Sequence, residues 1–179
     1  MLFRSHKNHA RILEALCLLK NKGNKKHVVF VGGDKGNRKN ITEMVEALNL
    51  SEQVHILGFV DSKSLKYLYQ NCSAVLMPTY FGPTNIPPLE AWLFGKPIIY
   101  SRHLCEQTSD AAWYVDPDSA KSIADALEAV DNPLTVELLL VKSKVAMERI
   151  NQKRSESEVQ FAELLKRTAL RMRCFNHQT

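Results

Sequence analysis

The sequence contains no long apolar run. No stretch of its 179 residues approaches the roughly 20 apolar residues that a membrane-spanning helix needs. The segment from Met1 to Lys7 lacks the long apolar core of a secretory signal peptide. We therefore expect a cytoplasmic protein. Because the net charge is +5, a peripheral contact at the inner face of the cell membrane stays open, but we expect no nucleic-acid partner.

Paired cysteines and clustered histidines are also missing. The four cysteines are widely spaced and form no CxxC pair, and the six histidines include no HxxxH or HExxH pair. Zinc sites normally show such spacings. The sequence therefore predicts no metal site, and it predicts buried free thiols in a reducing compartment.

The glycine pattern of dinucleotide-binding domains is absent too. Gly32 and Gly33 follow a strand-like run, but the spacing to Gly36 is not GxGxxG, and no acidic residue ends the next expected strand. This weakens the interpretation as an NAD-binding domain. We interpret the segment as a turn, with a backbone contact to a ligand phosphate as the alternative.

What the sequence does contain is an alternation of short apolar runs with helix-period segments, which is typical of βαβ units and a parallel sheet. Strands are expected at residues 28–31, 54–57, 74–77, 97–100 and 112–115, and helices at 9–20, 41–48, 62–70, 87–95 and 120–130. A helical pattern then runs from Leu134 to about Met172, with a break expected near Asn151. We predict an α/β, Rossmann-like domain over residues 1–132, with helices on both faces of a parallel sheet. A helical C-terminal extension over residues 133–179 is expected to pack on it.

One loop at the expected ligand edge has a distinctive composition. Ligands of open parallel sheets bind beyond the carboxyl ends of the strands. The loop after Met77 is polar and leads into a helix opened by Pro87, where free N–H groups and the helix dipole suit a diphosphate. Glu90, in the first turn, can accept both hydroxyls of a ribose. Alternatively, Glu90 only offsets the helix dipole while Thr84 or Asn85 caps the helix.

The run from Phe81 to Ala91, followed by Gly95 to Ser101, resembles the donor-site signature of family 4 retaining glycosyltransferases. It is most similar to the bacterial branch that builds O-antigen and capsular polysaccharides. Supporting segments occur in the family's order at residues 6–9, 28–33, 57–60 and 110–117. The resemblance covers about residues 3 to 130. It implies the C-terminal, nucleotide-sugar-binding half of a GT-B fold.

The resemblance assigns roles position by position. Glu90 matches the second glutamate of the family's E-x7-E motif, which holds the nucleotide ribose. Lys7, just before the first expected helix, matches the basic residue that neutralises the donor diphosphate, which makes it the expected catalytic residue. Gly82 stands where the family has the first glutamate, the residue that normally touches the donor sugar. The sugar is therefore expected to be read by Asn85 or by backbone groups.

Two further segments take their roles from the same resemblance. The backbone amides of three loop residues match the loop that grips the phosphate and the donor sugar: Thr84, Asn85 and Ile86. The turn that matches the segment receiving the nucleobase consists of Gly58, Phe59 and Val60. The donor is therefore expected to be a nucleotide-diphosphate sugar, with no cofactor and no metal.

The reaction implied by the resemblance moves a sugar, with mannose among the candidates, from the nucleotide diphosphate to a glycan or lipid-linked acceptor, with retention of the anomeric configuration. The acceptor-binding N-terminal half is missing from this chain, so we expect it elsewhere in the same longer chain or in a separate chain. The isolated chain is then expected to bind donor without transferring sugar. Two alternatives stay open: a non-catalytic module that binds a nucleotide sugar or a partner, and an enzyme similar to sugar-nucleotide 2-epimerases.

Overall fold

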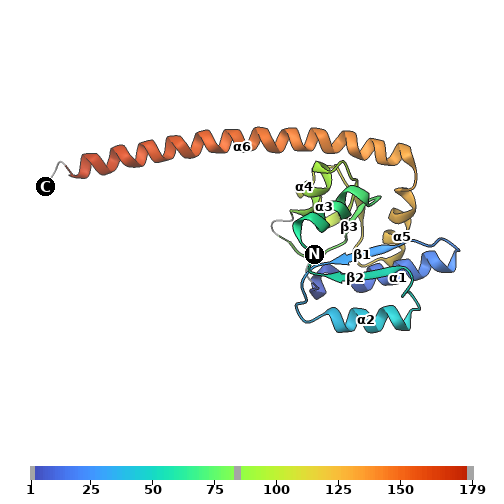
Figure 1. The fold of residues 1–179 in the computed structure, drawn as a ribbon. Coiled ribbons are helices and arrows are strands. Elements are labelled where there is room, and N and C mark those ends of the chain that lie inside the picture. Colours follow the sequence, from blue (N-terminus) through green and yellow to red (C-terminus); the bar gives the residue numbers. More distant parts are fainter. Residues whose placement is uncertain (1–2, 83–85, 177–179) are drawn as a thin grey trace.

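The structure is a computed structural model that describes residues 3–82 and 86–176, with side chains as far as residue 168. Strands and helices alternate along the chain (Figure 1). The strands are β1 (Val28–Val31), β2 (Val54–Gly58), β3 (Val75–Met77), β4 (Ile98–Ser101) and β5 (Trp113–Val115). The helices are α1 (His9–Asn21), α2 (Arg38–Ala47), α3 (Ser62–Asn71), α4 (Pro87–Leu93), α5 (Ala120–Ala129) and α6 (Pro133–Asn176), with 3-10 helices η1 (Ser5–Lys7) and η2 (Arg102–Gln107).

Two of the helix starts follow directly from their capping residues. The side chain of Asp61 accepts a hydrogen bond from the N–H of Ser64 at the start of α3, and that of Ser119 accepts one from Ser122 at the start of α5. Such caps satisfy N–H groups that have no partner inside the helix. The helices therefore begin at Ser62 and Ala120, where the sequence predicts their starts.

All strand pairs are parallel, and they form two groups. β1 pairs with β2, and β4 lies between β3 and β5. The N-terminal segment lies between the groups: the Phe3 N–H donates to Gly33 O at 3.1 Å, and the Tyr80 N–H donates to His6 O at 2.9 Å. The segment before α1 therefore connects the carboxyl ends of β1 and β3.

Helices cover both faces of the sheet, as the alternation of side chains along β4 shows. Ile99 is buried in a cluster with Leu16 of α1 and Ile123 of α5, whereas Ile98 and Tyr100 are buried in a second cluster with Trp92 of α4. Successive residues of a strand point to opposite faces, so one strand serves both cores. The predicted parallel α/β architecture is confirmed.

As far as its side chains are described, the long C-terminal helix α6 packs on the domain through its first half. Leu139, Ser143 and Ala146 are buried at helical spacing, whereas every residue from 151 to 168 is exposed. The helix passes through Asn151 without interruption, so the predicted break there is wrong. The division of the chain at residue 132 stays a prediction. None of the described helices is long and apolar enough to span a membrane.

The cysteines differ from expectation in one respect. Cys17, Cys72 and Cys105 are free thiols, but each is half-buried rather than buried. Among the residues whose side chains are described, no group of three metal-binding side chains is close enough to hold a metal ion.

Candidate functional site

The segment before α1 is held in place by one buried asparagine. Asn8 is 6% exposed and has a left-handed backbone, with φ 60°. Its side-chain amide donates to Pro78 O at 3.0 Å and to Pro117 O at 2.8 Å. Pro78 and Pro117 come directly after β3 and shortly after β5. The two hydrogen bonds of Asn8 therefore hold the residues before it at the carboxyl edge of the sheet.

Lys7 is a half-buried cation at this edge. Burial lowers the pKa of its ammonium group, and the positive charge of Arg4 lowers it further. Among the described residues, no carboxylate lies within ion-pair distance of Lys7. A desolvated ammonium group without a counterion gains from an anionic ligand, and a phosphate oxygen is one such ligand.

The loop after β3 is anchored to the same segment. The hydroxyl of the fully buried Thr79 lies 2.9 Å from His6 O, and the hydroxyl of Ser101 donates to Thr79 O at 2.7 Å. Further along the loop, the side-chain amide of Gln107 donates to Gly82 O at 2.9 Å. Of the predicted loop contacts, Thr84 and Asn85 lie outside the described residues, and Ile86 is exposed at the start of α4.

Glu90 lies in the first turn of α4 and is half-buried. Its carboxylate Oε2 accepts a hydrogen bond of 2.6 Å from the hydroxyl of Tyr69 in α3. The position before the helix is occupied by Ile86, which makes no side-chain cap, whereas Thr84 and Asn85, the caps of the alternative interpretation, lie outside the described residues. Glu90 therefore does more than offset the helix dipole, because a second helix holds its carboxylate.

Sequence reasoning did not find Tyr69. α3 carries tyrosines at positions 67 and 69, and periodicity alone does not say which one faces α4. The structure distinguishes them: Tyr67 is 66% exposed, whereas Tyr69 is half-buried and stacks on Phe94, with ring centroids 5.3 Å apart.

The turn after β2 presents an exposed aromatic ring. Gly58 has φ 72°, a backbone conformation that glycine adopts without strain, and its carbonyl accepts a hydrogen bond from the Gly32 N–H at 2.7 Å. The next residue, Phe59, is 87% exposed, and Val60 is half-buried. A large apolar ring on a fixed turn suits stacking against a planar ligand such as a nucleobase.

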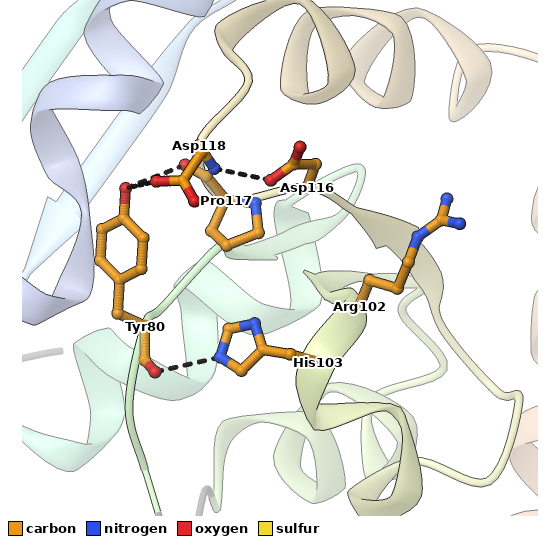
Figure 2. A pocket seen from close by; sticks show the side chains of 6 residues that line it. All are labelled: Tyr80, Arg102, His103, Asp116, Pro117 and Asp118. Carbon is orange, nitrogen blue, oxygen red and sulfur yellow. Dashed lines mark hydrogen bonds between the residues drawn. The ribbon is translucent and has the colours of Figure 1, made fainter.

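An open hollow of about 870 Å³ lies beyond the ends of β3, β4 and β5 (Figure 2). Its lining residues carry both signs of charge: Tyr80, Arg102, His103, Asp116, Pro117 and Asp118. The Tyr80 hydroxyl donates to Asp118 Oδ1 at 2.7 Å, and His103 Nε2 lies 3.0 Å from Tyr80 O. Sequence reasoning selected the ends of β3 and β4 by the strand-end rule, and Asp116 and Pro117 fall in the supporting segment 110–117, but no spacing in the sequence brings these six residues together.

The comparison with protein families identifies most of this domain. Residues 2–132 match the family model described as glycosyl transferases group 1. Among curated proteins, the chain is 30% identical over 107 residues to the O-antigen chain mannosyltransferase RfbU of Salmonella typhimurium. It is 26% identical over 121 residues to the O-antigen chain mannosyltransferase B of Escherichia coli. These matches cover 59% and 66% of this chain but only 30% and 32% of those proteins.

Solved structures give the same fold. Anabaena HepE in complex with UDP superposes with a TM-score of 0.73 at 19% identity, over 89% of this chain and 47% of that one. The C-terminal domain of the glycosyl transferase group 1 protein LpcC from Francisella tularensis superposes with a TM-score of 0.69 at 19% identity, over 83% of this chain and 81% of that one. The chain therefore belongs to the glycosyl transferases group 1 family, as the C-terminal, donor-binding domain of its GT-B fold.

Proposed function

We propose that this chain binds the nucleoside diphosphate of a sugar donor through Lys7, the turn at residues 58–60, the loop at residues 84–86 and Glu90. The observation that carries the proposal is the half-buried ammonium group of Lys7, which has no carboxylate partner among the described residues. It lies next to His6, whose carbonyl accepts the Tyr80 N–H from the loop that leads to α4 and Glu90.

The complete reaction is a retaining sugar transfer. The bond between the anomeric carbon and the diphosphate oxygen breaks, the acceptor oxygen bonds to that carbon, and the proton of the acceptor hydroxyl passes to the leaving diphosphate. Negative charge grows on the leaving diphosphate, and the Lys7 ammonium group stabilises it. Electrostatic stabilisation of developing charge is usually the largest catalytic effect, and removing one such contact costs about 100- to 1000-fold in rate. No metal is needed for this role.

The names of the relatives support a proposal for the donor and the acceptor. RfbU and its Escherichia coli counterpart are named as O-antigen mannosyltransferases, which supports mannose as the sugar and a growing glycan or lipid-linked glycan as the acceptor. HepE was solved with UDP, which supports a nucleoside diphosphate as the leaving group. The described residues do not select a nucleobase, so UDP and GDP are both candidate nucleotides.

The isolated chain is proposed to bind donor without transferring sugar. It spans about a third of the length of the curated relatives it matches. GT-B enzymes place the acceptor on a second domain, and the contacts assigned above all concern the donor. A non-catalytic nucleotide-sugar-binding module is a second candidate, because Gly82 stands where the family has the glutamate that touches the donor sugar.

Calorimetric titration of a lysine variant tests the diphosphate contact. Lys7→Ala should weaken binding of UDP or GDP by about 10- to 100-fold, the range for one charge-assisted hydrogen bond. It should leave binding of the bare nucleoside unchanged. Raising the salt concentration should weaken only the wild-type diphosphate complex, since screening acts on charge.

Lys144→Ala is the control for this titration, because Lys144 is an exposed lysine on α6 that is not among the proposed donor contacts. This variant should bind both ligands as the wild type does. Equal loss of diphosphate and nucleoside binding in Lys7→Ala would remove Lys7 from the phosphate site.

A further inference from the structure

Tyr69 of α3 contacts the α4 segment in two ways, through its hydroxyl at Glu90 and through its ring at Phe94. The Tyr69 hydroxyl donates to Glu90 Oε2 at 2.6 Å, and the Tyr69 ring stacks on Phe94 with an interplanar angle of 13°. Phe94 is one helical turn beyond Glu90, so one tyrosine contacts α4 at both places. The ring contact fixes where the hydroxyl lies, and the hydroxyl fixes one carboxylate oxygen.

The rest of α3 contributes little to the core. None of its residues is fully buried, and Tyr69 is one of its half-buried members. Tyr69 also packs against the cluster that contains Trp92 of α4 and Ala146 of α6. The side chain thus connects an exposed helix to a buried cluster and ends at a carboxylate.

We propose that Tyr69 is a positioning residue that holds the Glu90 carboxylate in the orientation that accepts the ribose diol of the nucleotide. The inference rests on the proposed function, in which Glu90 contacts the ribose. A carboxylate has about four acceptor positions on its two oxygens. Tyr69 takes one of them on Oε2, which leaves Oε1 and a second position on Oε2 for the two adjacent ribose hydroxyls.

The protonation state of Tyr69 agrees with this role. Burial raises the pKa of the Tyr69 hydroxyl well above its usual range, and the Glu90 carboxylate raises it further. The hydroxyl therefore keeps its proton and remains a hydrogen-bond donor throughout the physiological pH range. The Glu90 side chain is already fixed by this donor before the nucleotide binds. Binding therefore loses less side-chain entropy, and the affinity for the nucleotide is higher.

Removing the hydroxyl while keeping the ring isolates the effect. Tyr69→Phe retains the stacking on Phe94 and deletes only the donor to Glu90. We expect about tenfold weaker binding of UDP or GDP, the size of one hydrogen bond to a charged group. Binding of the corresponding 2′,3′-dideoxynucleoside diphosphate should not change, because that ligand offers Glu90 no hydroxyl. A general loosening of the fold would weaken both ligands equally.

The experiment is a set of calorimetric titrations of UDP, GDP and their 2′,3′-dideoxy forms against four proteins: wild type, Tyr69→Phe, Tyr67→Phe and Glu90→Gln. Tyr67→Phe is the matched control, since it deletes the same atom from an exposed tyrosine of the same helix. The inference is supported if Tyr69→Phe loses affinity for the ribose form alone and Tyr67→Phe behaves as the wild type does.

The outcomes separate the inference from the function on which it rests. Suppose that Glu90→Gln no longer prefers the ribose ligand over its dideoxy form. The positioning role of Tyr69 is then wrong, and the proposed function stands, if Tyr69→Phe keeps the wild-type preference, binds more tightly than the wild type, or weakens both ligand forms equally. If the wild type binds no nucleoside diphosphate, or if Glu90→Gln discriminates between the ligand forms as the wild type does, the ribose contact is wrong and the role of Tyr69 falls with it.

Discussion

Replacing Asn8 should destabilise the domain far more than its small side chain suggests. The Asn8 amide donates to two carbonyls, those of Pro78 and Pro117, and both prolines are buried. Asn8→Gly removes both hydrogen bonds but tolerates the left-handed backbone. A buried polar group that loses its partner costs about 1–3 kcal/mol. Pro78 O then loses its side-chain partner, whereas Pro117 O keeps a longer contact of 3.3 Å from the Tyr80 hydroxyl. The free energy of unfolding should therefore fall by about 2–3 kcal/mol.

A second substitution separates the hydrogen bonds from the backbone. Asn8→Ala loses the same two bonds and must also hold φ near 60°, which costs a residue with a Cβ about 1–2 kcal/mol. The matched control is Asn49→Gly: Asn49 is exposed, has φ 54°, and its side chain forms no hydrogen bond within the described part of the chain. We expect the order of stability to be Asn49→Gly, then Asn8→Gly, then Asn8→Ala.

Urea unfolding followed by tryptophan fluorescence measures these differences, because Trp92 is 7% exposed in the native state. The free energies of unfolding can be compared directly when the variants share the same m-value, which is the slope of the free energy against urea concentration. If Asn8→Gly and Asn49→Gly differed by less than about 1 kcal/mol, the two carbonyls would not depend on Asn8, and the reasoning would be refuted.

Three further predictions concern pH, the base and catalysis. Burial lowers the pKa of His9 from 6.5 to about 4, so the unfolded chain binds more protons between these values and stability falls as the pH drops through 6.5. Between pH 7 and pH 5 we expect the free energy of unfolding, measured in urea, to fall by an amount on the order of 2 kcal/mol. The variant His9→Phe should not show this fall, and an unchanged pH dependence in that variant would contradict the prediction. Phe59→Ala should weaken nucleotide binding by about tenfold, because stacking on a base contributes about 1–3 kcal/mol. Its melting temperature should not change, because the ring is exposed. An unaltered affinity in calorimetry would exclude a contact between Phe59 and the base. The isolated chain should transfer no radiolabelled sugar from GDP-mannose or UDP-sugars to a lipid-linked acceptor, and robust transfer would show that one domain suffices.

The sequence predicted those parts of the fold that depend on neighbouring residues. The strand at Val28–Val31 is a β-branched run closed by glycines, and it was predicted with its observed bounds. The caps Asp61 and Ser119 act within three residues of themselves. Such local signals survive because no distant contact has to be known to interpret them.

The parts that were missed depend on contacts between distant positions. The hydrogen bond from Tyr69 to Glu90 joins residues in different helices, and the bonds of Asn8 reach Pro78 and Pro117. No periodicity encodes these pairs. The break expected at Asn151 failed for another reason: asparagine costs a helix only about 0.7 kcal/mol relative to alanine, which good helix formers on either side offset.

The most direct test of the donor-binding site is calorimetric titration of UDP and GDP into wild type and Glu90→Ala. The account predicts that the wild type binds at least one of the two nucleotides. Glu90→Ala should bind that nucleotide about 30- to 150-fold more weakly, the equivalent of roughly 2–3 kcal/mol, while its melting temperature stays that of a folded domain. Absence of binding by the wild type, or equal affinity of the two proteins, would contradict the account.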